Sequence, residues 1–310
     1  MENHKNTPFN STNGDKEYEE LNHVWNLAEP AYPETEISAE QVEEALQNVH
    51  SRIDDSGPDY SSNQTSSQER YWLYARYLVA AAALITFGLY FLFTPIHISV
   101  PYGEMATIEL PDGSLVELNS GSELTYSRFF GRADRDLTLN GEGYFSVEPA
   151  AVPFRVTSNG AVTEVIGTQF NIRSWRDDPN SETVLTVTDG KVDFFAERSE
   201  HYKVTLTAGK LSRWNMEMET PIVEEPLNIT DRIGWKENRL IFKEQSLIVI
   251  IHELERRFNT RISLEVPGAG LDTLTAYYSE PKSAAAVLED ISTVKGFRFA
   301  ETANGYRIFK

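Results

Sequence analysis

The chain has 310 residues, a formal net charge of −19 and no cysteine. Its length suits two or three domains, and its acidity argues against nucleic acid as a direct partner, because phosphate backbones need clustered Lys and Arg. The lack of cysteine excludes disulfides, thiolate zinc sites, thiol catalysis and lipid attachment through an N-terminal Cys.

Residues 1–76 are predicted to contain two short amphipathic helices. Pro30 and Pro33 separate them, and Ser38 followed by Gln41 has the spacing of a capping box that begins the second helix. Residues 54–69 are predicted to be a flexible linker. Apolar residues recur at helical spacing in both helices, as Leu21, Val24, Trp25 and Ala28 and as Val42, Ala45, Leu46, Val49 and Ile53.

Apolar stripes on an acidic helix pair favour a protein partner. Residues 1–76 contain 15 Asp and Glu against 5 Lys and Arg, which gives a net charge of −10. Two short helices bury little surface alone, so the stripes should remain available for binding. The alternative is a self-contained helical hairpin that only caps the chain. The expected partner contacts are Leu21, Val24, Trp25, Val42, Leu46 and Val49.

Residues 77–95 are predicted to form a transmembrane helix. The run YLVAAAALITFGLYFLF at 77–93 carries no charge and would span about 25 Å at 1.5 Å per residue. Tyr71, Trp72, Tyr74 and Tyr77 crowd one end, as interfacial aromatics do. The alternatives are a buried core helix, which these flanks disfavour, and a cleaved signal peptide, which would begin much nearer the N-terminus.

Basic residues predict the orientation of this helix. Arg70 and Arg76 flank its N-terminal side, whereas the first Lys or Arg on the far side is Arg128. The positive-inside rule therefore places residues 1–76 in the cytoplasm and residues from about 96 onward across the membrane.

Residues 96–215 are predicted to be an all-β domain, either a sandwich or a short solenoid. The segments 107–110 and 115–118 alternate in polarity around a turn at Pro111-Asp112-Gly113-Ser114. Further short alternating runs follow, separated by glycines, and no helical stripe intrudes.

The remaining residues are predicted to be a linker and a small α+β domain. Residues 216–232 are acidic with two prolines, which is typical of a linker. Residues 233–310 follow the order β-α-β-β-α-β-β, with a hairpin at Asn304-Gly305 closing the last two strands. The whole chain is thus predicted to be a multidomain protein.

No catalytic, metal or cofactor motif is evident, and we expect neither an enzyme nor a bound cofactor. His252 and Glu253 are predicted to lie on the solvated side of the helix at 247–258. Asp177-Asp178-Pro179-Asn180 could bind calcium, but a polar turn is the better interpretation. Gly141-Glu142-Gly143 is predicted to be a turn or bulge rather than a dinucleotide loop. Trp175, Trp214 and Trp235 could form a sugar platform, although core or inter-domain packing is favoured.

Four motifs, in order, resemble the FecR family. They are LPDGSLVELNSGSELTY from residue 110, LNGEGYFSV from 139, PFRVTSNGAVTEVIGTQFNI from 153 and VTDGKV from 187. Members of this family are membrane-bound anti-sigma factors of cell-surface signalling. Residues 234–247, together with the helix ending in ELERRF, resemble the C-terminal domain of the Bacteroidota-type members, itself similar to the short signalling domain of secretins and TonB-dependent receptors. The N-terminal region is shorter than in proteobacterial members.

This resemblance implies a relay across the cell envelope. The signalling domain of an outer-membrane TonB-dependent receptor would touch the periplasmic part of this protein, which would be held in the inner membrane by one pass. The cytoplasmic helices would bind an extracytoplasmic-function sigma factor and so control transcription of uptake genes. The flexible linkers at 54–69 and 216–232 favour regulated cleavage by a site-specific protease, a hypothesis that a full-length protein unshortened during induction would contradict.

Two other functions remain open from the residues alone. The first is a membrane-anchored periplasmic glycan-binding or structural module with an incidental cytoplasmic tail. The second is an anchored hydrolase, which would need a clustered pair of acids on the β domain.

Overall fold

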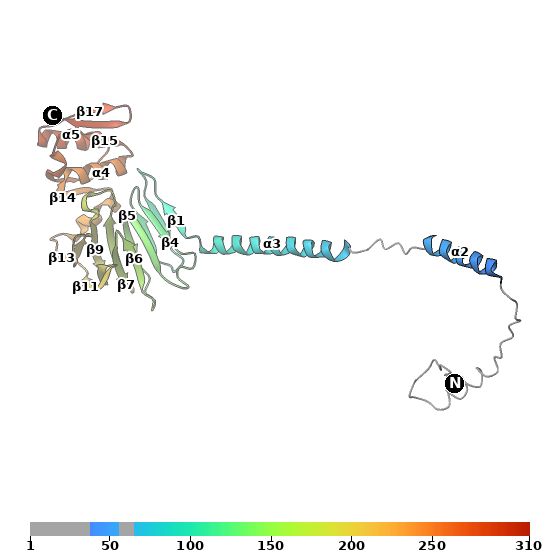
Figure 1. The fold of residues 1–310 in the computed structure, drawn as a ribbon. Coiled ribbons are helices and arrows are strands. Elements are labelled where there is room, and N and C mark those ends of the chain that lie inside the picture. The colour runs from blue at the N-terminus through green and yellow to red at the C-terminus, as the bar shows by residue number, and fades with distance from the viewer. Residues whose placement is uncertain (1–37, 56–64) are drawn as a thin grey trace. The chain divides into compact units, whose positions relative to one another are not determined.

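The computed structural model describes residues 38–55 and 65–310 (Figure 1). The chain falls into two units, Met1–Leu78 and Val79–Lys310. The described part of the first unit contains α2 (Ala39–Asp55) and the start of α3 (Thr65–Phe93). All strands of the described residues lie in the second unit.

A 13-stranded sheet follows α3. Its strands are β1 (Ile96–Ser99), β2 (Ala106–Glu109), β3 (Leu115–Leu118), β4 (Glu123–Tyr126), β5 (Asp136–Ser146), β6 (Phe154–Ser158), β7 (Ala161–Val165), β8 (Gln169–Ser174), β9 (Thr183–Asp189), β10 (Lys191–Ala196), β11 (Ser199–Thr207), β12 (Leu211–Trp214) and β13 (Ile222–Glu224). Neighbouring strands are antiparallel except for the parallel pair of β5 and β6.

The long strand β5 joins the two halves of this sheet. Its first residues pair with β4 and β6, and its last residues pair with β3 and β8. The change occurs at Gly141, where φ is +130° and a Cβ would lie 2.7 Å from the Cα of Ser122. Only glycine fits there, because any side chain would collide with the neighbouring backbone.

The two halves enclose one apolar core. Alternate side chains of each strand point inward, as the period of a strand requires. Phe145, from one half, packs on Phe154 of the other with ring centroids 6.2 Å apart. The core is completed mainly by fully buried aliphatic residues, including Val116, Leu118, Leu124, Val156, Ile172, Leu185 and Val192. The sheet therefore curls around its own core in a nearly closed, barrel-like form; the wealth of strands is as predicted, whereas the sequence suggested a sandwich or a short solenoid.

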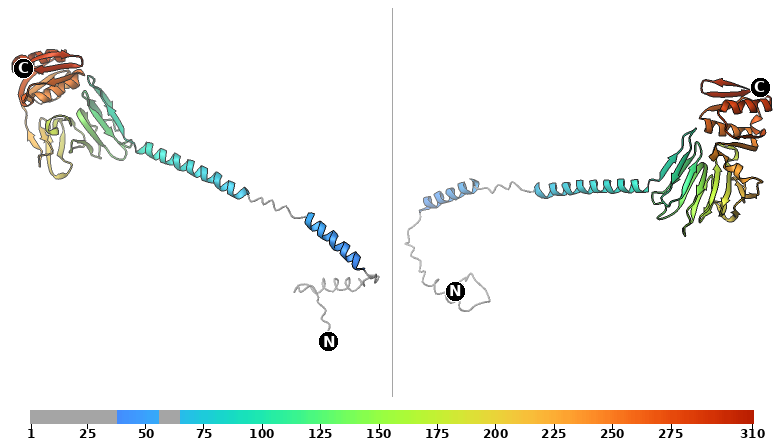
Figure 2. Two further views of the ribbon diagram at one scale, coloured as in Figure 1. Left: turned by 45° about the horizontal axis from the view of Figure 1, so that its top comes forward. Right: turned by 180° about the vertical axis from the view of Figure 1, so that it is seen from behind.

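A small α+β domain follows. Its elements are β14 (Leu240–Ser246), α4 (Leu247–Phe258), β15 (Arg261–Leu264), β16 (Thr273–Tyr278), α5 (Ala284–Lys295), β17 (Arg298–Thr302) and β18 (Gly305–Phe309). The order matches the predicted β-α-β-β-α-β-β, and β17 and β18 form the expected hairpin. Figure 2 shows these elements gathered together against the β-rich part.

Two predicted linkers contain regular structure. Residues 216–232 include β13, which pairs with β12, and the beginning of the 3-10 helix η2 (Ile229–Glu237). Residues 65–69 belong to α3, and residues 54 and 55 belong to α2. The remainder of the linker at 54–69 lies outside the described residues.

Candidate functional site

The second predicted helix exists and presents its apolar stripe to solvent. The capping box forms, because the Ser38 N–H donates to Gln41 Oε1 at 3.2 Å and the Gln41 N–H donates to Ser38 Oγ at 3.4 Å. Val42, Leu46 and Val49 are 46%, 48% and 54% exposed. A surface of this kind can receive the groove or helix of a partner. The other expected contacts, Leu21, Val24 and Trp25, lie outside the described residues.

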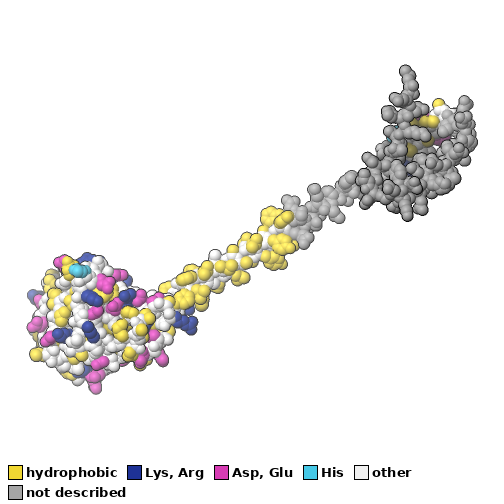
Figure 3. All heavy atoms as spheres, turned by 90° about the horizontal axis from the view of Figure 1, so that it is seen from below, with side chains coloured by type: hydrophobic (Ala, Val, Ile, Leu, Met, Phe, Trp, Pro, Cys, Tyr) yellow, Lys and Arg dark blue, Asp and Glu magenta, His cyan; other side chains and the backbone are white. Residues whose placement is uncertain are grey.

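The apolar helix α3 has the length and composition of a membrane span. Residues Tyr71–Phe93 have a mean hydropathy of 1.7, and no part of this segment is buried within the described part of the chain. Hydrophobic side chains cover its surface in Figure 3. Because a core helix of a soluble domain would be buried, these observations together with the apolar sequence suggest a single-pass membrane protein.

The β-rich part and the C-terminal domain meet in a buried polar network. The indole N–H of Trp235 donates to Asn171 Oδ1 at 3.1 Å, and Asn171 Nδ2 donates to Glu142 Oε1 at 3.0 Å. Asn119 Nδ2 donates to the other oxygen of Glu142 at 2.9 Å. Trp235, which follows the β-rich part in the chain, is thus connected to the buried carboxylate of Glu142 through the side-chain amide of Asn171.

A second cluster at this junction is centred on Asp178. Its carboxylate contacts Arg173 at 2.7 Å, the buried Arg256 of α4 at 3.4 Å and Nδ1 of His252 at 3.3 Å. Arg256 also lies 4.0 Å from the ring centroid of Trp175, and its carbonyl oxygen accepts the hydroxyl of Ser120 at 2.6 Å. Helix α4 is therefore held against the β-rich part by charge, stacking and hydrogen bonding.

The prediction for His252 and Glu253 is wrong. Their side chains are only 21% and 12% exposed, and His252 faces Asp178 instead of water. The apolar stripe of α4 faces its own domain, so a second domain covers the side that the sequence pattern assigns to solvent. Trp175, Trp214 and Trp235 are buried, which agrees with packing and leaves no exposed aromatic platform among them.

Burial and neighbouring charges shift the pKa values of this junction. Burial, followed by the charge of Glu253, raises the pKa of Glu142 to about 7 against the opposing effects of Arg173 and the two amides. Burial alone would raise the pKa of Asp178, but Arg173, His252 and Arg256 together lower it to about 2. The hydrogen bond to Asp178 raises the pKa of His252.

A polar cavity of about 210 Å³ opens beside these groups. Its lining includes Glu142, Arg173 and Asp178 from the β-rich part and Gln245 and Val249 from the C-terminal domain. Within the described ranges, no group of three or more His, Asp or Glu side chains is arranged to hold a metal ion.

The pKa of Glu142 predicts that the protein becomes less stable as pH rises. Between its unfolded value of 4.5 and about 7, the folded state holds a proton that the unfolded state has lost. His252 acts in the same direction, because its stabilising charge disappears above its raised pKa. We expect a higher melting temperature at pH 5.5 than at pH 8, with a Glu142 contribution on the order of 2–3 kcal/mol. Calorimetry of wild type and Glu142→Gln tests this, and an equal pH dependence in both would contradict it.

No local signal in the sequence connects the residues of the junction to one another. Asp178 lies in the polar turn at 177–180 and Arg256 in the helix ending ELERRF, 78 positions away, and neither segment indicates the other. The one hint is the doublet Arg256-Arg257 at the end of α4, which also suits a solvated helix end.

Comparisons with known proteins agree with this architecture. The family model FecR protein matches residues 97–193, and the model FecR, C-terminal matches residues 239–309. Two crystal structures of a "putative anti-sigma factor" from Parabacteroides distasonis are similar at 26% identity, with TM-scores of 0.63 and 0.62. They cover 70% and 69% of this chain and 99% of their own chains. No curated protein matches the chain. With its β-rich part and its C-terminal domain each matched in order, the chain belongs to the FecR family.

Proposed function

We propose that this protein is a transmembrane anti-sigma regulator. The observation that carries the proposal is the exposed apolar face of α2, which precedes the apolar helix α3 and the FecR domain in the chain. Within the described residues, Val42, Leu46 and Val49 are exposed and belong to no apolar core, and an exposed apolar face of this kind favours a partner that covers it. The similarity to the "putative anti-sigma factor" from Parabacteroides distasonis supports a sigma factor as that partner. The family suggests a regulatory role without catalysis.

The finer mechanism follows the relay expected from the sequence. In this proposal the N-terminal region lies in the cytoplasm and binds an extracytoplasmic-function sigma factor. The FecR domain and the C-terminal domain lie in the periplasm and receive the signal from an outer-membrane TonB-dependent receptor. The positive-inside distribution of Arg70, Arg76 and Arg128 supports this orientation. The exposed backbone of an edge strand such as β17 could pair with the receptor's signalling domain.

Replacing Leu46 by Asp should abolish capture of a sigma factor by the full-length protein. A charge at the centre of an apolar contact costs about 2 kcal/mol or more, which corresponds to roughly a 30-fold weaker complex. The measurement is affinity purification of the detergent-solubilised full chain from the native host, followed by mass spectrometry and a titration with the recovered sigma factor.

The matched control is Gln47→Asp. It adds the same side chain at the next position, about 100° further around α2 and outside the apolar stripe, and should leave binding within about twofold. Equal binding by both variants would exclude the apolar face as the contact. Failure of the wild type to capture any sigma factor would overturn the proposed function, and a periplasmic binding module would become the leading account.

A further inference from the structure

The helix α3 passes almost directly into the β-rich part. It ends at Phe93 and β1 begins at Ile96, so only Thr94 and Pro95 connect them. Two residues cannot form a flexible spacer, because even a fully extended pair spans only about 7 Å. The edge of the sheet that begins with β1 must therefore lie close to the end of the helix.

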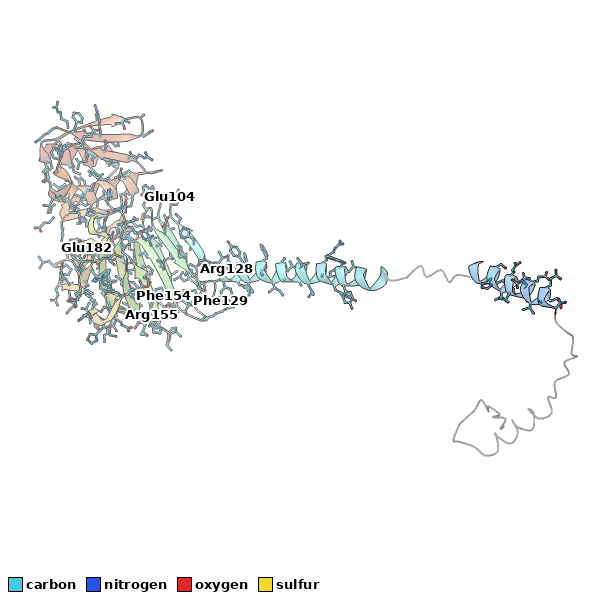
Figure 4. All side chains as sticks on the ribbon, viewed as in Figure 1. Glu104, Arg128, Phe129, Phe154, Arg155 and Glu182 are labelled. Carbon is cyan, nitrogen blue, oxygen red and sulfur yellow. The ribbon has the colours of Figure 1, made fainter. Side chains whose placement is uncertain are left out.

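The loop at residues 127–133 contacts the last turn of this helix. Arg128 donates from Nε to the carbonyl oxygen of Thr94 at 3.0 Å, and its guanidinium lies 4.3 Å from the ring centroid of Phe91. The ring of Phe129 lies 6.1 Å from that of Phe93. Figure 4 shows Arg128 and Phe129 beside the end of α3. Phe91 belongs to the apolar span, so Arg128 lies at the depth where the span ends.

The position of this loop is fixed by the core of the β-rich part. Phe130 is 1% exposed and packs edge-on against Tyr126 and Phe154. The backbone N–H of Gly131 donates to the Asp134 carbonyl at 2.7 Å, which closes the loop. Since Phe130 is held inside the core, its chain neighbours Arg128 and Phe129 cannot move away from the helix without opening the core.

The loop carries positive charge that the protein leaves without acceptors. Within the described residues, no acceptor contacts either Nη group of Arg128, and none contacts the guanidinium of Arg132. Both side chains are exposed, in a chain whose net charge is −19. Arginine has a planar set of donors that fits phosphate oxygens, and arginines beside a span extend toward the headgroups.

We infer that the loop at residues 127–133 is a docking surface for anionic phospholipid headgroups. Arg128 and Arg132 bind headgroup phosphates, and Phe129 rests at the interface beside Phe93. This contact holds the β-rich part against the bilayer in one orientation. The inference rests on the membrane-spanning role of α3 in the proposed function.

The absence of native cysteine allows a direct test. A spin label at Ala133→Cys is introduced into the full chain in vesicles that contain phosphatidylglycerol. Labels at Ala82→Cys, within α3, and at Leu271→Cys, which is 80% exposed in the C-terminal domain, provide the lipid and water references. For each label, the collision rate with oxygen, which concentrates in lipid, is divided by the collision rate with a water-soluble nickel chelate. We expect this ratio at position 133 to fall between the ratios of the lipid and water references.

Reversing the charges of Arg128 and Arg132 distinguishes headgroup binding by the loop from mere attachment of the β-rich part to α3. The double variant Arg128→Glu with Arg132→Glu should shift the label at position 133 toward the value of the water reference. The matched pair Arg298→Glu with Arg307→Glu, on β17 and β18, should leave it unchanged.

Three results would overturn the inference. The first is a wild-type label at position 133 that already equals the water reference while the label at position 82 is in lipid. The second is a label that charge reversal does not move. If the label at position 82 is itself in water, the membrane anchor fails, and with it the proposed function.

Discussion

Replacing Asp112 by Ala should lower the free energy of unfolding by about 3–5 kcal/mol. Asp112 and Arg135 form a buried ion pair at 2.6 Å, with side chains 7% and 3% exposed. Arg135 also donates to the carbonyl oxygens of Glu148 and Val152, so it ties three turns together. Removal of the carboxylate leaves a buried guanidinium without a counter-charge, which costs far more than the pair itself contributes.

The surface pair Arg155–Glu164 provides the control. It has a similar distance of 2.6 Å, but its side chains are 47% and 20% exposed. Glu164→Ala should therefore cost less than about 1 kcal/mol. Chemical denaturation of the full chain in detergent measures both variants. A loss at Asp112 no larger than the loss at Glu164 would show that Arg135 finds other compensation.

Replacing Asp178 by Asn should loosen the C-terminal domain from the β-rich part. Arg256 is 2% exposed and would keep only Asp177 and Glu253 nearby, at 3.4 and 3.5 Å. We expect a loss of about 2–3 kcal/mol, which is below the full cost of an unpaired buried charge because these two carboxylates remain. The fluorescence of the tryptophans at the junction should report unfolding of the C-terminal domain at a lower temperature than the remainder.

The neighbouring acid is the matched control. The side chain of Asp177 is 54% exposed, so Asp177→Asn should cost less than about 1 kcal/mol. The pH dependence adds a second readout, because the stabilisation by Asp178 is present above 3.8 and lost as pH falls toward about 2. Wild type should therefore lose stability on acidification below pH 4, and the Asn variant should lose less. A single cooperative transition in every variant would contradict separable unfolding.

Local patterns in the sequence predicted most of the fold. The alternation around Pro111-Asp112-Gly113-Ser114 gave β2 and β3, and helical spacing gave α2, α4 and α5. These elements depend on periods of two and 3.6 residues, which a single segment displays without help from the rest of the chain. The predicted linker at 216–232 shows where local patterns fail. Its acidic residues and prolines are typical of a linker, but three of its residues form β13 because they pair with β12.

The junction between the domains could not be predicted in this way. Trp235 and Asn171 are 64 positions apart, and the hydrogen bond between them depends on how two finished domains meet. The helix α4 is amphipathic relative to its own core, so its polar face looks like a solvated one until another domain covers it. For α2 the reverse holds: its apolar stripe is visible in the sequence, and in the structure that stripe is exposed.

The short connection at Thr94 and Pro95 bears on how such a protein could be cut. A protease needs a stretch of extended, unpaired chain, which is normally supplied by exposed loop tips or by local unfolding. At this boundary the helix ends two residues before β1, and all four residues of β1 pair with β4. Cleavage next to the membrane would therefore require β1 to detach from the edge of the sheet first. The rate at which β1 detaches, rather than the accessibility of an exposed loop, would therefore limit the rate of cleavage.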